Sequence, residues 1–152
     1  MDTRIHFGTE SPDMSGIHQW LAGDGDAGAV VLFTGHVRDE AGQVSGLVLE
    51  HYPQMAEAET LRILEQAQAR WPLLRAWVQH RVETIRPGEL IVLVGVASEH
   101  RQAAFEAAAF VMDFLKTRVP IWKKTLSADG ATWVSARHRD ELAAARWQPE
   151  ED

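Results

Sequence analysis

Apolar residues recur every three or four positions in two long stretches of the chain, and this period predicts two amphipathic helices, at about 55–71 and 99–117. We expect their buried faces to be formed by Leu61, Leu64, Ala67 and Trp71 in the first helix, and by Phe105, Ala109 and Met112 in the second. Shorter helices are predicted at 15–22 and at about 139–147.

Between the helices lie stretches in which apolar and β-branched residues alternate or run together, as is typical of strands. The predicted strands cover residues 29–37, 44–52, 75–82, 90–98, 121–127 and 131–136. The most apolar, 90–98, is expected at the centre of a sheet, and 29–37 with 44–52 is a candidate hairpin. A second hairpin is predicted around the turn sequence ADG at 128–130. Because strands come in adjacent pairs, antiparallel pairing and an α+β fold with about three main helices are favoured.

Length and composition predict one ordinary globular domain over residues 1–152, with 45% apolar and 24% charged residues. No apolar run approaches the ~20 residues needed to cross a bilayer, and the first residues lack a signal-peptide pattern, so we expect a cytoplasmic protein. The net charge of −7 argues against general nucleic-acid binding. The absence of cysteine excludes disulfides, thiolate metal sites and a cysteine nucleophile, so any sulfur that the protein handles must come from outside the chain.

Cationic residues nevertheless gather near the C-terminal end of the chain. Residues 113–134 hold four of them among large apolar residues: Lys116, Arg118, Lys123 and Lys124. Lys116 is expected at a helix C-terminus, where a cation complements the helix dipole. Lys123 and Lys124 lie in a predicted strand and therefore point to opposite faces. A half-buried lysine near other cations loses part of its proton affinity and can act as a nucleophile or acid/base; the alternative is a set of solvated surface lysines.

Two other basic pairs stand where apolar strands end. His36 and Arg38 close a predicted strand, a common place for a ligand. His100 and Arg101 fall in the first turn of a helix, where free N–H groups favour an anion such as phosphate or carboxylate. The alternatives are an ordinary polar strand exit and a solvated helix start. We expect no metal site, because the histidines are scattered, and interpret His80 as a hydrogen-bonded, half-buried histidine.

Taken together, these segments resemble the large, catalytic subunit of molybdopterin synthase. The similarity lies in GAVVLFTGHVRD, LVLEHYPQMAE, HRVETIRPGELIVLVGVASEHRQAAFEA, FVMDFLKTRVPIWKK and DGATWV, which follow the family order over roughly residues 28–134. The resemblance implies an α/β-hammerhead-like fold with antiparallel sheets, a core at about 28–137 and a C-terminal tail at 138–152.

The resemblance also implies an enzyme of molybdenum cofactor biosynthesis, which builds the dithiolene of molybdopterin on cyclic pyranopterin monophosphate. The two sulfurs would arrive as a thiocarboxylate on the C-terminal Gly-Gly of a small ubiquitin-like partner. The family forms a central homodimer with one small subunit at each outer end, a heterotetramer, and we expect no cofactor. The chain has no cysteine to donate sulfur, which agrees with a need for a separate carrier.

Carried over position by position, the resemblance implies that Lys116 and Lys123 are catalytic. Either could hold the thiocarboxylate or protonate the departing oxygen, and Lys116 could instead attack the carrier's acyl carbon. The substrate-binding positions also include His36, Val37, Arg38, His100, Arg101, Lys124 and Thr125. Phe33 and Met112 line the pocket. Thr125 departs from the family pattern, in which many members have Glu, and a hydroxyl would orient a lysine less strongly than a carboxylate.

Two other functions fit the residues taken alone. One is a binding module that only docks a ubiquitin-like tail, which predicts partner binding without consumption of the pterin precursor. The other is a lysine-dependent, aldolase-like enzyme, which predicts a Schiff base that borohydride traps with a small carbonyl substrate and no protein partner.

Overall fold

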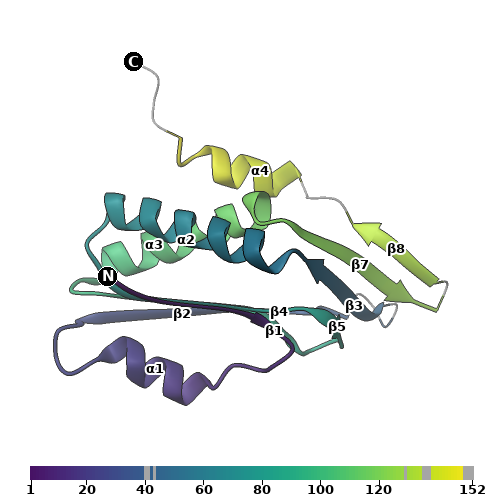
Figure 1. Ribbon diagram of the computed structural model, residues 1–152, viewed down its shortest axis with the longest axis horizontal. Helices are drawn as coiled ribbons and strands as arrows, with labels where there is room; N and C mark the ends of the chain where they lie inside the picture. Colours follow the sequence, from purple (N-terminus) through teal and green to yellow (C-terminus); the bar gives the residue numbers. More distant parts are fainter. Residues whose placement is uncertain (40–41, 43, 129, 135–137, 149–152) are drawn as a thin grey trace.

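The computed structural model describes residues 1–39, 42, 44–128, 130–134 and 138–148. Its helices are α1 (Met14–Ala22), α2 (Pro53–Arg70), α3 (Arg101–Arg118) and α4 (His138–Ala145). Its strands are β1 (Asp2–Gly8), β2 (Ala29–His36), β3 (Val44–His51), β4 (Leu73–Arg81), β5 (Glu83–Ile85), β6 (Leu90–Ser98), β7 (Ile121–Ser127) and β8 (Gly130–Val134). Over this part of the chain the strands form two sheets, which is the predicted α+β arrangement (Figure 1). None of the described helices is long and apolar enough to cross a membrane.

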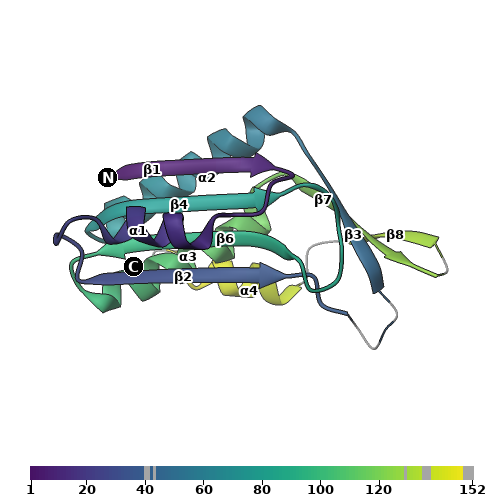
Figure 2. The same cartoon turned by 90° about the horizontal axis from the view of Figure 1, so that it is seen from below.

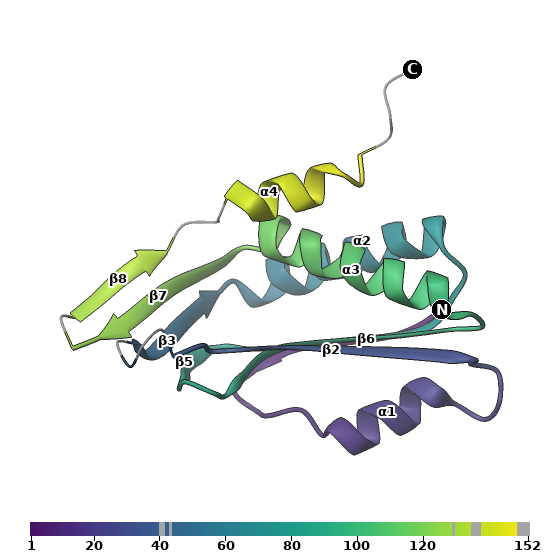
Figure 3. The same ribbon diagram turned by 180° about the vertical axis from the view of Figure 1, so that it is seen from behind.

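The first sheet has the strand order β1-β4-β6-β2. β1 runs parallel to β4, whereas β4 and β2 are antiparallel to β6. α2 and α3 cover one face of this sheet and α1 covers the other (Figure 3). The side chains of β6 alternate between the faces, so that Val92, Val94 and Val96 pack towards α2 and α3, while Leu93 and Ala97 pack towards α1. The predicted central position of strand 90–98 is therefore confirmed.

The second sheet has the order β5-β3-β7-β8, is antiparallel, and extends beyond the helices (Figures 1 and 2). A small cluster of buried apolar side chains connects it to the end of β2: Val37, Leu47, Leu49 and Ile85. The backbone N–H of Val37 also donates to the carbonyl oxygen of Glu89, just before β6, at 3.0 Å. The exit of β2 is thus attached to both sheets.

The predicted hairpin between 29–37 and 44–52 is wrong. β2 pairs with β6 in the first sheet, and β3 pairs with β5 and β7 in the second. Apolar side chains on both faces of β2 pack into the cores under α1 and under α2 and α3, so β2 belongs to the helix-covered sheet. The predicted hairpin of β7 and β8 is confirmed, although Asp129 in its turn lies outside the described residues.

The buried faces of the two long helices differ in part from those predicted. Leu64 and Ala67 are buried, but Leu61 is 40% exposed and Phe105 63% exposed. In α3 the sheet is contacted instead through a row of small and large apolar residues: Ala104, Ala107, Ala108, Val111, Phe114 and Leu115. Three alanines at its start let the helix lie close to the sheet, and the larger Phe105 is turned outwards.

Two of the observed strands, β1 and β5, are not predicted from the sequence, because neither has a clear run or alternation of apolar residues. β1 alternates exposed and half-buried residues and carries polar side chains at its start, while β5 has only three residues. β1 is placed by its parallel pairing with β4, a contact between segments about 70 residues apart. The C-terminal helix is predicted at nearly its observed position and is held by Trp147, whose ring packs edge-on against Trp71 and Phe110.

Candidate active site

The chain has three lysines, and all of them lie where α3 ends and β7 begins. Lys116 is in the last turn of α3, is exposed, and makes no hydrogen bond or ion pair to another described residue. Only Val119 and Pro120 separate the helix from the strand that carries Lys123 and Lys124. The three lysines therefore lie close together along the backbone, on either side of one change from helix to strand, as the sequence predicts.

The pairing of β7 confirms that its two lysines point to opposite faces. Lys123 lies opposite Leu49 of β3, which is 2% exposed, and is itself half-buried, so it belongs to the face of the sheet that packs inwards. Lys124 lies opposite Trp133 of β8, and its ammonium is 4.2 Å from the centre of that ring. This distance is that of a cation–π contact, with the indole partly exposed. Thr125 shares the inward face with Lys123.

A group of stacked rings lies near Lys123, between the two sheets. The ring of Phe7, at the end of β1, is nearly parallel to His51 of β3 and to His80 of β4, with centroids 5.5 and 5.7 Å away. The pKa of His80 is lowered from 6.5 to about 4: burial is the main cause, the charges of Lys123 and His51 add to it, and a hydrogen bond to the backbone opposes it. Lys123 therefore stands beside an imidazole that is neutral at pH 7.

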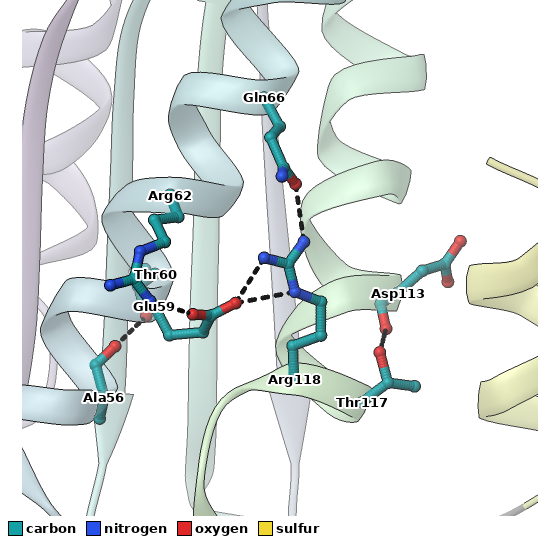
Figure 4. A network of polar contacts seen from close by, with 8 residues as sticks. All are labelled: Ala56, Glu59, Thr60, Arg62, Gln66, Asp113, Thr117 and Arg118. Carbon is teal, nitrogen blue, oxygen red and sulfur yellow. Dashed lines mark hydrogen bonds and ion pairs between the residues drawn. The ribbon is translucent and has the colours of Figure 1, made fainter. Parts of the chain in front are cut away.

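The last turn of α3 is fixed by Arg118, which points towards Glu59 and Gln66 of α2 (Figure 4). Its guanidinium donates to Glu59 at 2.7 Å and to Gln66 at 2.7 Å, and packs over the ring of Phe114. Although burial alone would raise the pKa of Glu59, hydrogen bonds from Arg62 and Arg118 lower it below the usual value. The helix end is thus bound to α2 on one side, while Lys116 stays exposed on the other.

The exit of β2 holds the second predicted group. His36 is hydrogen-bonded through Nδ1 to the carbonyl oxygen of Gly88 and through Nε2 to the hydroxyl of Thr34, both at 3.1 Å. Because a carbonyl only accepts, Nδ1 carries a proton and donates it to Gly88, while Nε2 contacts the hydroxyl of Thr34. Val37 is buried and Arg38 is exposed. The strand exit therefore offers an exposed guanidinium beside a fixed imidazole.

The third group, His100 and Arg101, is at the opposite end of α3 from Lys116. Both residues are exposed at the helix start, in a hollow also lined by Gln102, Phe105 and Glu106. At 1.5 Å per residue, Arg101 and Lys116 are about 22 Å apart along the helix. One chain therefore does not bring its helix start and its lysines to the same small substrate.

The apolar positions predicted to line the pocket lie between these groups. Phe33 is 40% exposed on β2, an edge strand of the first sheet, and Met112 is half-buried on α3, four residues before Lys116. α3 packs beside β2, so the two side chains belong to one region of the surface. In the described part of the chain, no group of three or more His, Asp and Glu residues is arranged to hold a metal ion.

Comparison with known proteins assigns the chain to a family. Residues 8–118 match the MoaE protein family. The chain belongs to this family. The molybdopterin synthase catalytic subunit of Yersinia pestis is 47% identical over 148 residues, which cover 96% of this chain and 98% of that protein. The subunit of the same name from Mesorhizobium japonicum is 58% identical over 128 residues, covering 83% and 80%.

Solved structures have the same fold. Molybdopterin cofactor biosynthesis protein E from Burkholderia multivorans superposes with a TM-score of 0.83 at 36% identity, over 99% of this chain and 100% of that one. Molybdopterin synthase from Staphylococcus aureus gives 0.80 at 31% identity, over 86% and 96%. The MoaE relatives confirm the predicted fold class and the predicted identity as a catalytic subunit in molybdopterin biosynthesis.

The cluster of Phe7, His51 and His80 is the part of the site that sequence reasoning missed. His80 is half-buried and hydrogen-bonded, as predicted, but its position beside Lys123 is not expected from the sequence. The three rings come from three strands in two sheets. No local spacing connects them, so only the pairing of distant segments reveals the group.

Proposed function

We propose that this chain transfers sulfur from the C-terminal thiocarboxylate of a small ubiquitin-like carrier to cyclic pyranopterin monophosphate, forming the dithiolene of molybdopterin. The observation that carries the proposal is the position of all three lysines, between residues 116 and 124, around the α3–β7 junction of a chain without cysteine. Relatives of nearly the same length are named catalytic subunits of molybdopterin synthase, a name that implies a second subunit. We place the reaction in the cytoplasm, in line with these biosynthetic relatives.

In each of two rounds, the carbon–sulfur bond of the carrier breaks and a carbon–sulfur bond to the pterin side chain forms. The oxygen that the sulfur displaces is balanced by the oxygen that the carrier gains, because its terminal glycine ends as a carboxylate. This exchange of sulfur for oxygen requires no oxidant or reductant. It requires cations to hold two anionic groups, the thiocarboxylate and the substrate phosphate, and an acid to protonate the departing oxygen.

Lys116 and Lys123 are the proposed catalytic residues. Lys116 is exposed and so accessible to the end of an extended carrier tail, whereas Lys123 sits on the inward face of β7. Either ammonium can hold the thiocarboxylate or supply a proton, and an uncharged Lys116 can attack the acyl carbon. The proposed substrate contacts are His36, Val37, Arg38, Lys124 and Thr125, with Phe33 and Met112 lining the pocket.

His100 and Arg101 enter this proposal through a second copy of the chain. Their separation from Lys116 of about 22 Å along α3 is too great for one small substrate to bridge. In a symmetric homodimer, the helix start of one chain can stand beside the lysines of its partner. The exposed Phe33 and Phe105 near α3 and β2 are suited to such a contact. With one carrier at each outer end, the assembly is a heterotetramer.

Subunit complementation tests this arrangement. Chains with Lys116→Ala and chains with Arg101→Ala should each be almost inactive, but mixing them before the dimer forms should restore activity. Random pairing at equal amounts gives half mixed dimers, each with one intact site, so about a quarter of wild-type activity is expected. Mixing after dimer formation without exchange is the control. Activity that stays at the sum of the two single variants would show that the residues act within one chain.

Reconstitution with purified components tests the function itself. The chain, a carrier ending in a Gly-Gly thiocarboxylate and the pterin precursor should together yield dithiolene, measured by mass spectrometry with two sulfurs per product. The same carrier ending in a carboxylate is the matched control and should yield none. Carrier binding without loss of precursor would support a docking module instead. A borohydride-stable adduct with a small carbonyl compound and no carrier would favour a Schiff-base enzyme.

A further inference from the structure

Two strands and a turn meet at one end of the first sheet. β2 and β4 are both antiparallel to β6, so both of them end where β6 begins (Figure 2). The β5–β6 turn, residues 86–89, leads into β6 at the same place. The proposed substrate contacts His36, Val37 and Arg38 therefore leave β2 beside this turn.

The exit of β2 is held by the β5–β6 turn. The register of β2 against β6 shifts between Gly35 and His36, so the regular ladder is interrupted there. Beyond the shift, the N–H of Val37 donates to the carbonyl oxygen of Glu89 at 3.0 Å, and the N–H of Gly88 donates to the carbonyl oxygen of Val37 at 2.7 Å. Nδ1 of His36 adds a hydrogen bond to the carbonyl oxygen of Gly88 at 3.1 Å. The direction of the exit therefore depends on the shape of the turn.

Glu89 closes the turn and joins it to β4. Its Oε1 accepts from the backbone N–H of Arg86 at 2.9 Å, and its own N–H donates to the carbonyl oxygen of Arg86 at 3.1 Å. Between them Gly88 has a φ of 84°, a left-handed conformation that suits glycine. The second oxygen of the carboxylate, Oε2, accepts from Nη1 of Arg81, at the end of β4, at 3.0 Å.

The guanidinium of Arg81 is largely buried. Its side chain is 11% exposed, and in the described part of the chain no group forms a hydrogen bond with its buried Nε. A cation with so little access to water depends on the charge of Glu89. Hydrogen bonds from Arg81 and from the backbone of Arg86 in turn lower the pKa of Glu89 below its usual value, although burial opposes them, so this carboxylate is ionised at pH 7. Each partner therefore holds the other in place, and the turn with them.

We propose that the ion pair of Arg81 and Glu89 positions the substrate contacts at the exit of β2. By holding the β5–β6 turn closed against β4, the pair fixes the backbone of His36 and Val37 before the substrate binds. Contacts that are ordered in advance bind more tightly, because binding no longer has to order them. The inference rests on the proposed function, in which this strand exit contacts the pterin precursor, and it adds two residues that act through the backbone.

Removal of both charges tests the inference without leaving a buried charge unpaired. Arg81→Met/Glu89→Ala removes the ion pair and the side-chain contact to Arg86, while Met keeps an apolar chain in the buried space. The chain offers a matched control near the start of β4, where Arg75, with a side chain 13% exposed, pairs with Asp26 in the loop after α1. Arg75→Met/Asp26→Ala removes this equivalent ion pair, and circular dichroism checks that both variants fold.

Amide hydrogen exchange, followed by NMR, measures the strand exit without any turnover. The amides of Val37 and Gly88 should exchange about tenfold faster in Arg81→Met/Glu89→Ala, relative to the amide of Val94 in the centre of β6. The reference amide corrects for any change in global stability. In the control variant the relative rates should stay as in the native chain. Equal relative rates in all three proteins would overturn the proposal.

The KM for the pterin precursor connects the ion pair to the reaction. With saturating thiocarboxylated carrier, Arg81→Met/Glu89→Ala should raise this KM by about tenfold and change kcat by about twofold or less, because Lys116 and Lys123 lie on other elements. Glu89→Gln should raise KM less, since its amide oxygen still accepts a hydrogen bond. The control variant should keep the native KM. A purely structural role would instead lower kcat in both double variants and leave KM unchanged.

The two measurements separate this inference from the proposed function. If the native chain forms no dithiolene with carrier and precursor, the proposed function fails, whereas faster exchange at Val37 would still support the hold of the ion pair on the strand exit. If the native chain is active and Arg81→Met/Glu89→Ala has the native KM, the positioning role fails and the proposed function stands.

Discussion

Replacement of Lys116 by Ala should lower the rate of dithiolene formation by about 10²- to 10⁴-fold, the range that one acid/base group contributes. The side chain is exposed and makes no hydrogen bond or ion pair to another described residue, so its loss should leave the thermal midpoint nearly unchanged. The rate is measured as single turnover with saturating thiocarboxylated carrier, and folding by circular dichroism. A Lys116→Ala chain that turned over at the native rate would remove this lysine from the mechanism.

Lys116→Arg separates the two roles open to this residue. Arg retains the charge and can hold a thiocarboxylate, but it cannot act as a nucleophile or give up its proton near neutral pH. Substantial activity in Lys116→Arg would therefore favour anion binding, and a loss equal to that of Lys116→Ala would favour attack or proton transfer. Arg4→Ala is the matched control for Lys116→Ala, because it also removes an exposed cation. Arg4 packs over Trp20 of α1, on the other side of the first sheet from α3 (Figure 3).

The stability of the protein should fall as the pH is lowered from 7 to 5, and His80 should account for about 2 kcal/mol of the decrease. Its pKa is lowered from 6.5 to about 4 in the folded chain, mainly by burial. In this pH window the unfolded chain therefore binds a proton that the folded chain does not, which favours unfolding. Urea unfolding at fixed protein concentration should show the midpoint decreasing by about 1 M.

His80→Phe provides the comparison for this pH dependence. The variant can differ from the native chain in absolute stability, but its free energy of unfolding should vary much less between pH 7 and 5. The carboxylates with lowered pKa, Asp26, Glu59 and Glu89, lose their stabilising effect only at more acidic pH, where they become protonated. An equally steep pH dependence in His80→Phe would show that the imidazole is not held neutral in the fold.

The features that the sequence predicts well are those determined by local pattern. The apolar run 90–98 becomes the buried strand β6, and alternation in β7 correctly separates Lys123 from Lys124. The proline after Lys116 marks the change from helix to strand. In each case the cause lies in a few neighbouring residues. The apolar run of β6 has to be buried, the side chains of β7 alternate with a period of two, and Pro120 has no backbone N–H to continue the helix.

The features that escape prediction are contacts between distant segments. The sequence predicts a hairpin of β2 and β3, because the two strands are adjacent along the chain. β2 instead pairs with β6 in the first sheet, where helices bury the apolar side chains on both of its faces. His80 gains its significance only from Phe7 and Lys123, which come from opposite ends of the chain. Such neighbours follow from strand order, and strand order is decided by the whole core.

The short connection between α3 and β7 also limits how this protein can change through evolution. Side chains along a strand alternate in direction, so inserting or deleting one residue at Val119 or Pro120 would exchange the directions of Lys123 and Lys124 relative to the helix. Substitutions at the connection keep that relation, whereas single-residue insertions and deletions reverse it. The number of residues between Lys116 and β7 therefore decides which of the two neighbouring lysines of the strand faces inwards.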